Sequence, residues 1–404
     1  MSGPLDGTLV LDLSRVLAGP WASQALADLG ARVIKVERPG RGDDTRSWGP
    51  PYLVSGDNRE SAYFLSANRG KESIAIDFKD PRGQAVILEL ARKSDILIEN
   101  YKVGGLKAHG LDYESVRKVN PAIVYCSISG FGQTGPYAKK PGYDFIIQAM
   151  SGLMSITGTG KATKVGVAVS DLITGLYASV GILGAYTRAK ETGQGEYIDV
   201  SLLDSQLATL ANQASNFLVS GESPGLSGNA HPNIVPYQVF ETADDPIVVA
   251  VGNDAQFVSL CHVIGCEQLA TDPRFVLNSD RVANRKALVP LVASELAKQA
   301  ALVWLRVLDD AGIPVGPVNT IGEAFADPHV VERQTVMHLH RDDLGQVPGV
   351  RSPIRFGSQV ADGGRAAPAL GDSTEAVLRE IGVSETEIEA MLTDGVVAKP
   401  AIKK

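Results

Sequence analysis

Short apolar segments in the first half of the chain constrain the fold more than any other sequence feature. Each is rich in valine and isoleucine, and helical periodicity or turn residues separate it from the next; they cover residues 7–12, 32–37, 73–77, 96–100 and 123–129. Segments of this kind that alternate with helices are typical of a mostly parallel sheet with helices on both faces. We therefore expect an α/β fold built on a large, doubly wound sheet.

The pattern of the chain changes after residue 220. The turn-rich segment 221–233 is followed by one strand pattern and by helical patterns at 254–264, 283–298 and 301–311. We expect the smaller domain, also α/β, to be inserted into the larger one at a surface linker. The expected boundaries are a large domain over 1–220, a small domain over 225–330 and a return to the large domain over 335–404.

Asp171 stands at the start of an apolar segment of helical length. The stretch from Thr163 to Tyr186 reads TKVGVAVSDLITGLYASVGILGAY, so we expect Ser170 or Asp171 to be the helix N-cap. The positive end of the helix dipole and unpaired backbone N–H groups would then favour the ionised carboxylate. An ordinary N-cap and a carboxylate nucleophile are both compatible with this stretch alone.

The composition excludes several classes of function. A net charge of −8 argues against nucleic acid as the main partner, although a local cluster of Arg and Lys can still bind phosphate. We found neither a signal peptide nor an apolar segment of about 20 residues, so we expect a cytoplasmic protein without a membrane partner. Three cysteines, Cys126, Cys261 and Cys266, are too few and too irregularly spaced for a disulfide framework, and we expect buried thiols.

Common cofactor and metal motifs are missing from the sequence. There is no GxGxxG after a strand and no GxSxG. Gly158–Lys161 resembles the end of a phosphate-binding loop, but Ala162 follows where a Ser or Thr is needed. His338 and His340 would share one face of a strand, and without a third ligand they indicate a solvated strand face rather than a zinc site. We expect no metal.

Eight sequence blocks, in register over nearly the full length, together resemble the class III coenzyme A transferases. They are PLDGTLVLDLSRVLAGP, VIKVERPGRGDDTRSWGPPY, NRGKESIAIDFKDPRG, SISGFGQTGPYAKKPGYDFIIQAMSG, SDLITGLYA, HPNIVPYQVF, GIPVGPVNT and LGDSTEAVLREIG. The resemblance implies a nucleophilic aspartate at Asp171. It also implies an intertwined homodimer, coenzyme A as a substrate, and no permanently bound cofactor or metal.

The resemblance places the coenzyme A site at the ends of the predicted strands. One departure concerns residues 106–108, where the family often has an arginine and this chain has Leu-Lys-Ala, so that a phosphate contact is either lost or supplied by Lys107. For any single Arg or Lys, a solvated surface charge is an equal alternative. The implied coenzyme A-binding residues are Arg15, Leu17, Ala18, Arg38, Ile76, Asp77, Phe78, Lys79, Asn100, Tyr101, Lys102, Lys140 and Tyr143.

The expected chemistry is attack by Asp171 on an acyl-CoA thioester, through a mixed anhydride and then an aspartyl-CoA thioester. The same fold family includes α-methylacyl-CoA racemases, which add a catalytic histidine where this chain has Tyr143. A tyrosine with an ordinary pKa near 10 is a poor base at neutral pH, which favours a transferase. A non-catalytic CoA-binding protein is the third alternative, and the presence of Asp171 argues against it.

Within the family, the blocks TRSWGPPY, ANRGKES and IVPYQVF look closest to the succinyl-CoA:glutarate type. A dicarboxylic acid needs a cation for its distant carboxylate, and Arg46 or Arg69 would offer a bidentate fork. Residues 225–230 are either a lid that excludes water or a plain linker. Trp48 is either a wall of the acyl pocket or a core aromatic residue. The expected substrate-binding residues are Arg46, Trp48, Arg69, Asp144 and His231.

Overall fold

The computed structural model describes residues 3–357, 361 and 363–400. These residues form two compact units, which are described separately below. Unit 1 combines the chain up to Leu153 with Val165–Val219 and with the part from His329 onward, and unit 2 combines Met154–Lys164 with Ser220–Pro328. The divisions at 219/220 and 328/329 lie close to the predicted domain boundaries. Residues 154–164, which the sequence reading assigned to the large domain, group with unit 2 instead.

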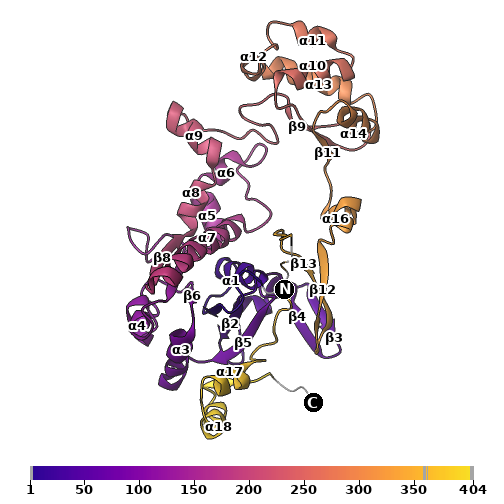
Figure 1. Ribbon diagram of the computed structural model, residues 1–404. Helices are drawn as coiled ribbons and strands as arrows, with labels where there is room; N and C mark the ends of the chain where they lie inside the picture. Colours follow the sequence, from indigo (N-terminus) through magenta and orange to yellow (C-terminus); the bar gives the residue numbers. More distant parts are fainter. Residues whose placement is uncertain (1–2, 358–360, 362, 401–404) are drawn as a thin grey trace. The chain divides into compact units, whose positions relative to one another are not determined.

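A seven-stranded sheet forms the centre of unit 1 in the described chain (Figure 1). Its order is β14-β5-β2-β1-β6-β7-β8, and every neighbouring pair is parallel except β14 with β5. The predicted α/β fold with a large, mostly parallel sheet is therefore confirmed. The strands are β1 (Leu9–Asp12), β2 (Arg32–Glu37), β5 (Lys71–Ile76), β6 (Ile96–Glu99), β7 (Val124–Ser129), β8 (Glu196–Ser201) and β14 (Val397–Ala398).

Helices cover both faces of this sheet because successive strand residues point to opposite faces. Val10 packs in one buried cluster and its neighbour Leu11 in the other, as do Ile96 and Leu97. The cluster of Val10 includes residues of α1 (Ala18–Asp28), α5 (Asp144–Met150), α7 (Val169–Thr192) and α8 (Leu202–Ala208). The cluster of Leu11 includes residues of α3 (Pro81–Lys93), α4 (Tyr113–Val119), α17 (Thr374–Glu380) and α18 (Glu385–Thr393).

Smaller elements complete unit 1. Two antiparallel hairpins, β3 (Tyr52–Ser55) with β4 (Asn58–Ser61) and β12 (Val336–Arg341) with β13 (Gly345–Val350), carry the apolar contacts of a minor cluster. His338 and His340 lie two residues apart on β12, and the described residues contain no group of three potential metal ligands. The remaining elements are η1 (Asp44–Ser47), α2 (Ala62–Ser66), η2 (Lys107–His109), α9 (Ala211–Ser220) and α16 (Pro328–Glu332).

Unit 2 has its own core around a three-stranded antiparallel sheet in the order β11-β10-β9. Cys261 and Cys266 are buried there, and Cys126 is buried in unit 1, all as free thiols. The expectation of buried, unpaired cysteines is thus met. The elements are α6 (Leu153–Ile156), β9 (Tyr237–Phe240), β10 (Ile247–Ala250), α10 (Asp254–Val263), α11 (Glu267–Thr271), α12 (Asn278–Ala283), α13 (Arg285–Leu296), α14 (Ala301–Asp310), β11 (Val315–Pro317) and α15 (Ile321–Ala326).

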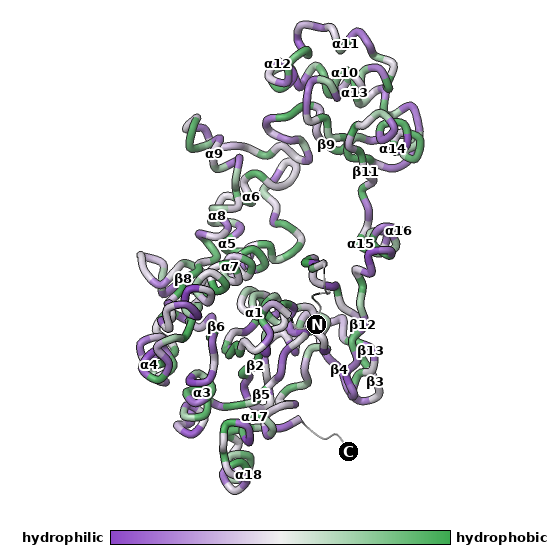
Figure 2. The backbone as a smooth tube through the Cα atoms, in the orientation of Figure 1, coloured by the Kyte–Doolittle hydropathy of each residue, from purple (hydrophilic) through white to green (hydrophobic). Residues whose placement is uncertain are grey.

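Helix α7 is longer and more apolar than the sequence reading assumed. Its best 18-residue window has a mean hydropathy of 1.3, which by length and composition alone is enough to cross a membrane, and a third of that window is buried. Figure 2 shows hydrophobic residues, in green, along much of this helix. The helix packs against α1, α8, β7 and β8 within unit 1. A core helix that covers a sheet can reach this length and hydropathy without crossing a membrane.

Candidate active site

The loop between β1 and α1 is held by side chains from three other segments of unit 1. Asn100, after β6, accepts a hydrogen bond from the backbone N–H of Arg15 at 3.0 Å and donates to its carbonyl oxygen at 2.7 Å. Asp43 accepts from the N–H of Val16 at 3.1 and 3.2 Å. Lys35, on β2, donates to the carbonyl oxygen of Ser14 at 2.8 Å. The backbone of residues 14–16 is therefore fixed at almost every polar group.

This loop contains a strained residue and leads directly into a helix. Val16 has a φ of 71°, in the left-handed region that β-branched residues rarely adopt. Helix α1 starts two residues later at Ala18, and its N-cap, Leu17, makes no side-chain capping bond. The first N–H groups of a helix need partners from elsewhere. The N–H of Ala18 is near the carboxylate of Asp171 and lowers the pKa of that group.

Asp171 lies in the first turn of α7, but it is not the N-cap. The helix starts at Val169 with Ala168 as its N-cap, so the prediction that Ser170 or Asp171 caps the helix is wrong. The predicted preference for the ionised form is also wrong. Burial and the charge of Asp144 raise the pKa of Asp171 to about 7, against the lowering effect of the Ala18 N–H. Loss of hydration outweighs the helix terminus here.

Asp144 and Tyr63 complete the immediate surroundings of Asp171. The carboxylate of Asp144 accepts from the N–H of Ser170 at 2.9 Å and from the amide of Gln148 at 2.8 Å, so it fixes the start of α7. Burial, and then the charges of Asp171 and Asp144, raise the pKa of Tyr63 to about 12. The ring of Tyr63 packs edge-on against Trp48 at 5.1 Å. Trp48 remains 40% exposed, which fits a pocket wall better than a core residue.

Tyr63 was missed in the sequence reading. It lies in the stretch ESAYFLSANRG, beside a block that carried the family resemblance, but nothing in its spacing pointed to Asp171. Tyr63 lies on helix α2, which begins after the N-cap Ser61. Its link to Asp171 is the effect of the Asp171 charge on the pKa of the Tyr63 hydroxyl, which depends on the fold and not on a local pattern.

Several of the predicted coenzyme A-binding residues gather beside the β1–α1 loop. Arg15 and Arg38 both form ion pairs with Asp44 at 2.8 Å, and their side chains are 43% and 46% exposed. The ring of Tyr101 lies 5.8 Å from the Arg15 guanidinium and 5.5 Å from the ring of Phe78. Two exposed cations and two aromatic rings within one region suit a phosphate and a planar base.

The other predicted coenzyme A-binding residues contribute in different ways. Leu17, Ala18 and Ile76 are buried, so they offer backbone or packing contacts. Lys79, Lys102 and Lys140 are exposed, and the ammonium of Lys140 lies 3.9 Å from the ring centre of Tyr137. Asp77 accepts from the N–H of Lys79 at 3.0 Å, Asn100 holds Arg15 as described above, and Tyr143 is the exposed N-cap of α5.

Arg46 and Arg69 do not have free guanidinium groups for a substrate carboxylate. Arg46 is almost buried and pairs with Glu37 at 2.7 Å and with Glu60 at 2.6 Å. Arg69 is 9% exposed and forms two hydrogen bonds to Asp28, at 2.8 and 2.5 Å. Because each guanidinium is already paired with buried carboxylates, this geometry argues against the predicted role of both residues and assigns them to the framework.

His231 and the predicted lid belong to unit 2. The ring of His231 accepts from the N–H of Asn233 at 3.1 Å and lies 5.2 Å from the ring of Tyr237. In the adjacent segment, the N–H of Ala230 donates to the carbonyl oxygen of Ser227 at 3.0 Å. The role of His231 in substrate binding and that of residues 225–230 as a lid stay predictions.

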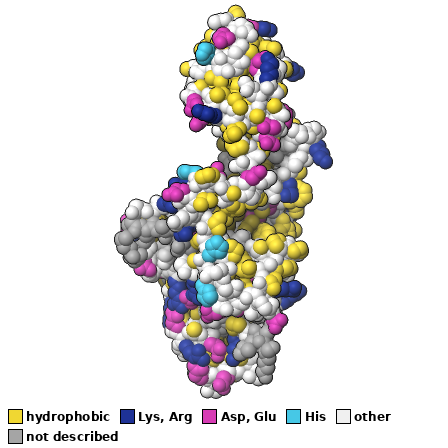
Figure 3. All heavy atoms as spheres, turned by 90° about the vertical axis from the view of Figure 1, so that its right-hand side faces the viewer, with side chains coloured by type: hydrophobic (Ala, Val, Ile, Leu, Met, Phe, Trp, Pro, Cys, Tyr) yellow, Lys and Arg dark blue, Asp and Glu magenta, His cyan; other side chains and the backbone are white. Residues whose placement is uncertain are grey.

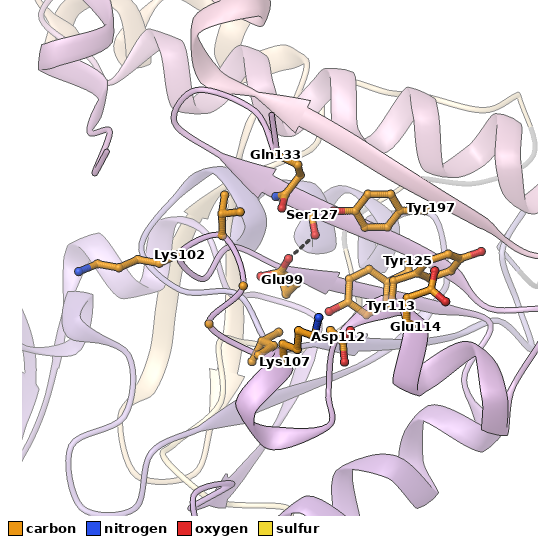
Figure 4. A pocket seen from close by; sticks show the side chains of 14 residues that line it. Glu99, Lys102, Lys107, Asp112, Tyr113, Glu114, Tyr125, Ser127, Gln133 and Tyr197 are labelled. Carbon is orange, nitrogen blue, oxygen red and sulfur yellow. Dashed lines mark hydrogen bonds between the residues drawn. The ribbon is translucent and has the colours of Figure 1, made fainter. Parts of the chain in front are cut away.

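A separate cavity of about 260 Å³ lies at the carboxyl ends of β6 and β7 (Figure 4). At its base, Glu99 accepts hydrogen bonds from the hydroxyl of Ser127 and from the N–H of Tyr101. Burial raises the pKa of Glu99 to about 7. Lys102 and Lys107 also line the cavity, and Figure 4 shows that they come from the loop after β6. Lys107 belongs to the segment 106–108 in which the sequence departs from the family, and its role as a substitute phosphate contact stays a prediction.

Comparison with known proteins gives a consistent picture. The model of CoA-transferase family III matches residues 5–374. A succinate–glutarate CoA-transferase from Agrobacterium fabrum is 48% identical over 386 residues, covering 95% of this chain and 96% of that protein. An acetyl-CoA:oxalate CoA-transferase from Acetobacter aceti is 43% identical over 389 residues, covering 95% and 97%. The crystal structure of a CaiB/BaiF family protein from Brucella suis has a TM-score of 0.83 at 45% identity, covering 94% of this chain and all of that one.

Proposed function

Because the chain belongs to CoA-transferase family III and is an enzyme of that class, we propose that it moves coenzyme A from succinyl-CoA to a dicarboxylic acid such as glutarate. The names of two relatives support a dicarboxylic substrate, since glutarate and oxalate both carry two carboxylates. The sequence blocks that look like the succinyl-CoA:glutarate type favour succinyl-CoA as the donor and glutarate as the acceptor. The observation that carries the mechanism is the partly buried Asp171 at the start of α7, whose pKa the nearby N–H of Ala18 lowers.

The proposed reaction begins with the ionised carboxylate of Asp171. One of its oxygens forms a bond to the acyl carbon of the donor, the carbon–sulfur bond breaks, and coenzyme A leaves as a thiolate. The product is a mixed anhydride between the acyl group and Asp171. A carboxylate with a pKa of about 7 is more basic than an ordinary aspartate, and it is still half ionised at neutral pH.

The thiolate then attacks the aspartyl carbon of the anhydride and releases the donor acid as its carboxylate. The acceptor acid attacks the resulting aspartyl-CoA thioester, and the same steps in reverse release the new acyl-CoA. Negative charge develops on the carbonyl oxygen of the aspartyl group in these steps. A fixed backbone N–H such as that of Ala18 stabilises this oxyanion. Each intermediate reacts with water, so exclusion of water by Trp48 and Tyr63 matters for the yield.

Coenzyme A itself is proposed to lie over the loop between β1 and α1. Arg15 and Arg38 hold Asp44 between them in the described chain, and a phosphate group would compete for the same two guanidinium groups. Tyr101 and Phe78 provide ring faces and edges beside these cations. In this proposal the charged end of coenzyme A binds at Arg15 and Arg38, and its thioester end extends along the loop toward Asp171.

A panel of donors and acceptors tests the substrate assignment. Succinyl-CoA is mixed with glutarate, oxalate and a monocarboxylic acid of matched length, and the acyl-CoA products are measured by mass spectrometry. We expect transfer to glutarate at the highest kcat/KM and no transfer by the Asp171→Asn enzyme. Normal turnover by that variant would reject the mechanism, and equal use of the monocarboxylic acid would reject the dicarboxylate assignment.

The same enzyme preparation also distinguishes a transferase from a racemase and from a non-catalytic CoA-binding protein. A racemase would exchange the hydrogen at C2 of an acyl-CoA with deuterated water in the absence of an acceptor acid. The residue at the position of the racemase histidine is Tyr143, whose side chain is 61% exposed. A binder would retain coenzyme A but give no exchange between donor and acceptor. We expect neither result.

A second copy of the chain is the proposed partner. Helices α7 and α9 expose apolar side chains, among them Val180 of α7 and Leu218 and Val219 of α9, at 68%, 78% and 88% exposure. Leu176 of α7 lines an apolar cavity of about 930 Å³ together with residues of β12 and β13. Figure 3 shows many exposed hydrophobic side chains on the face that it draws. Exposed apolar side chains of this kind suit contact with a second copy of the chain. Light scattering should give twice the mass of one chain, and a monomer at micromolar concentration would reject the dimer.

A further inference from the structure

Helix α7 is capped by a side chain from another helix. Its own N-cap, Ala168, carries only a methyl group and makes no side-chain capping bond to the first N–H groups of the helix. The carboxylate of Asp144, on α5, accepts from the N–H of Ser170 at 2.9 Å instead. Ser170 directly precedes Asp171, so this bond joins α5 to the turn on which the proposed nucleophile lies.

Gln148 holds the capping carboxylate in place. It follows Asp144 by four residues on α5, the spacing at which a glutamine and an aspartate meet on the surface of a helix. Its amide nitrogen donates to one oxygen of Asp144 at 2.8 Å, and the other oxygen of Asp144 accepts from Ser170. Asp144 is partly exposed, whereas Gln148 is fully buried. Without Gln148, the carboxylate would be able to turn from α7 toward solvent.

The orientation of the Gln148 amide is fixed by the chemistry of its partners. Its oxygen accepts from the N–H of Val165 at 2.8 Å, and a backbone N–H can only donate. The amide nitrogen therefore has to face Asp144 and the carbonyl oxygen of Val167, which lies 3.4 Å away. One buried side chain thus contacts both the segment that leads into α7 and the carboxylate that caps this helix.

Two further bonds at the start of α7 leave this task to Asp144. The hydroxyl of Ser170 donates to Gln206 of α8 at 2.8 Å, which holds the side chain of Ser170 rather than its backbone. The N–H of Leu172 donates to the carbonyl oxygen of Ala168 at 3.2 Å, which closes the first turn within the helix itself. Neither bond joins the backbone of that turn to a neighbouring element, whereas the bond to Asp144 does.

We propose that Gln148 is a positioning residue for the transfer reaction: by holding Asp144 against the first turn of α7, it keeps that turn and the carboxylate of Asp171 in place. The inference rests on the proposed role of Asp171 as the nucleophile. Gln148 acts through Asp144 and is not itself a catalytic residue. A displaced nucleophile slows the attack on the thioester, while the binding of coenzyme A at Arg15 and Arg38 changes less.

The ionisation of Asp171 should respond to the loss of Gln148. Two titratable side chains of neighbouring helices interact with Asp171: Asp144 from α5 and Tyr63 from α2. Burial and the charge of Asp144 raise the pKa of Asp171. If Asp144 turns away, the pKa of Asp171 falls, and the midpoint of the pH profile falls with it. This shift should be absent when Asp144 has already been removed.

The test uses Gln148→Ala and Gln148→Met, each alone and combined with Asp144→Ala. Alanine leaves space for a water molecule beside the N–H of Val165, and methionine fills the volume of the glutamine. The two substitutions therefore disturb the packing in different ways, so that one of them can be measured if the other prevents folding. The combined variants show whether Gln148 acts through Asp144, because the effects of two residues in one chain of contacts do not add.

Asn120→Ala is the matched control. The amide nitrogen of Asn120 donates to the carbonyl oxygens of Ala91 and Ser94 at 2.9 and 2.7 Å, and its amide oxygen accepts from the N–H of Ala122 at 3.1 Å. The control thus removes the same kind of amide bridge to the main chain. Asn120 precedes β7, at the amino ends of the strands, whereas the loops of the candidate site follow their carboxyl ends.

Steady-state kinetics with succinyl-CoA and glutarate between pH 5.5 and 8.5 give kcat, KM and the midpoint for each folded variant. In the Gln148 variants, we expect kcat at pH 8 to fall about 5- to 50-fold, with KM for succinyl-CoA within about threefold of wild type. The midpoint should fall by about 0.5 to 1 pH unit. In the Asp144→Ala background, the same substitutions should leave the midpoint in place and reduce kcat by less than about threefold. Asn120→Ala should change kcat by less than about twofold.

Three results would overturn the positioning role. The first is a kcat and a midpoint like those of wild type in the folded Gln148 variants. The second is the full effect of Gln148→Ala in the Asp144→Ala background, and the third is an equal loss of kcat in Asn120→Ala. Each of the last two would indicate a general loosening of the fold.

Urea unfolding separates the failure of this inference from the failure of the proposed function. The gain in the free energy of unfolding caused by Asp171→Asn reports the ionisation of Asp171 without turnover. This gain should increase from pH 5 to pH 8 in wild type and increase less in Gln148→Ala. An equal increase in both would reject the inference even if the substrates were wrong. If wild type turns over and hydroxylamine never modifies Asp171, the proposed nucleophile is wrong, whatever the unfolding shows.

Discussion

The backbone N–H of Ala18, the first residue of α1, lies near the carboxylate of Asp171 in the first turn of α7 and lowers the pKa of that carboxyl group. The two helices pack against each other along the same face of the sheet. A donor at a helix start and an acceptor on the neighbouring helix thus meet in one place. The same contact links the oxyanion donor to the nucleophile of the proposed reaction.

The dependence of kcat/KM on pH should report the ionisation of Asp171. Only the ionised carboxylate attacks, and burial together with Asp144 raises its pKa to about 7. We therefore expect kcat/KM for succinyl-CoA to increase about tenfold per pH unit below pH 7 and to level off above it. Initial rates between pH 5.5 and 8.5 in buffers of constant ionic strength measure this. A flat profile across that range would contradict the raised pKa.

Asp144→Asn should shift this profile to lower pH. The substitution removes the negative charge that raises the pKa of Asp171, while the amide oxygen still accepts from the N–H of Ser170. A more readily ionised Asp171 is active at lower pH but is also a weaker nucleophile, so we expect a lower plateau. Asp254→Asn, which removes a carboxylate in unit 2, is the control and should leave the midpoint in place. A midpoint unchanged in Asp144→Asn would show that burial alone sets the pKa.

Asp171→Asn should increase the stability of the folded protein at neutral and alkaline pH. A carboxyl group whose pKa is raised from 3.8 to about 7 binds its proton more tightly in the folded state, so its ionisation costs stability as the pH rises through that range. The cost is at most about 4 kcal/mol, at about 1.4 kcal/mol per pH unit. Urea unfolding of wild type and variant at pH 5 and pH 8 measures the difference. The gain in the free energy of unfolding should be larger at pH 8 than at pH 5. A larger gain at pH 5 would contradict the raised pKa of Asp171.

Arg46→Met should affect stability rather than the choice of acceptor. The substitution leaves Glu37 and Glu60 buried without their shared cation, which costs about 3–5 kcal/mol when one partner of a buried pair is lost. Urea unfolding measures this loss. The ratio of kcat/KM for glutarate to that for a monocarboxylic acid should stay within about twofold of wild type.

Arg59→Met is the matched control for Arg46→Met. Arg59 is exposed and lies over the ring of Tyr52 at 4.9 Å, so its loss should change the free energy of unfolding by about 0.5 kcal/mol or less. Selective loss of dicarboxylate use in Arg46→Met, with unchanged stability, would restore the role that the sequence suggested for Arg46.

Regular elements with strong local signals were predictable from the sequence. The strand Arg32–Glu37 has the predicted bounds, because β-branched residues mark it locally. The position of Asp171 at the start of a long helix was also predictable. The N-cap was placed two or three residues too late because Ala168 carries none of the side chains that normally mark a helix start.

The electrostatic properties of the site were not predictable, because they depend on partners far away in the chain. The sequence shows Arg46 in a Gly- and Asp-rich loop, where an exposed, ligand-binding cation is a natural reading, but not that Glu37 and Glu60 enclose it. The pKa of Asp171 depends on burial and on Asp144, which comes from another helix. Tyr63 had no sequence pattern that linked it to Asp171, whose charge raises the pKa of the Tyr63 hydroxyl in the folded chain.

The strand that closes one edge of the central sheet, β14, follows unit 2 in the chain. On the ribosome, β5 therefore emerges long before its antiparallel partner, and the nascent chain carries an open strand edge until the insertion has been fully translated. Open edges of this kind are templates for pairing with other molecules. The order of synthesis thus leaves Ala75 and Ile76 of β5 without their partner strand until the last part of the chain has emerged.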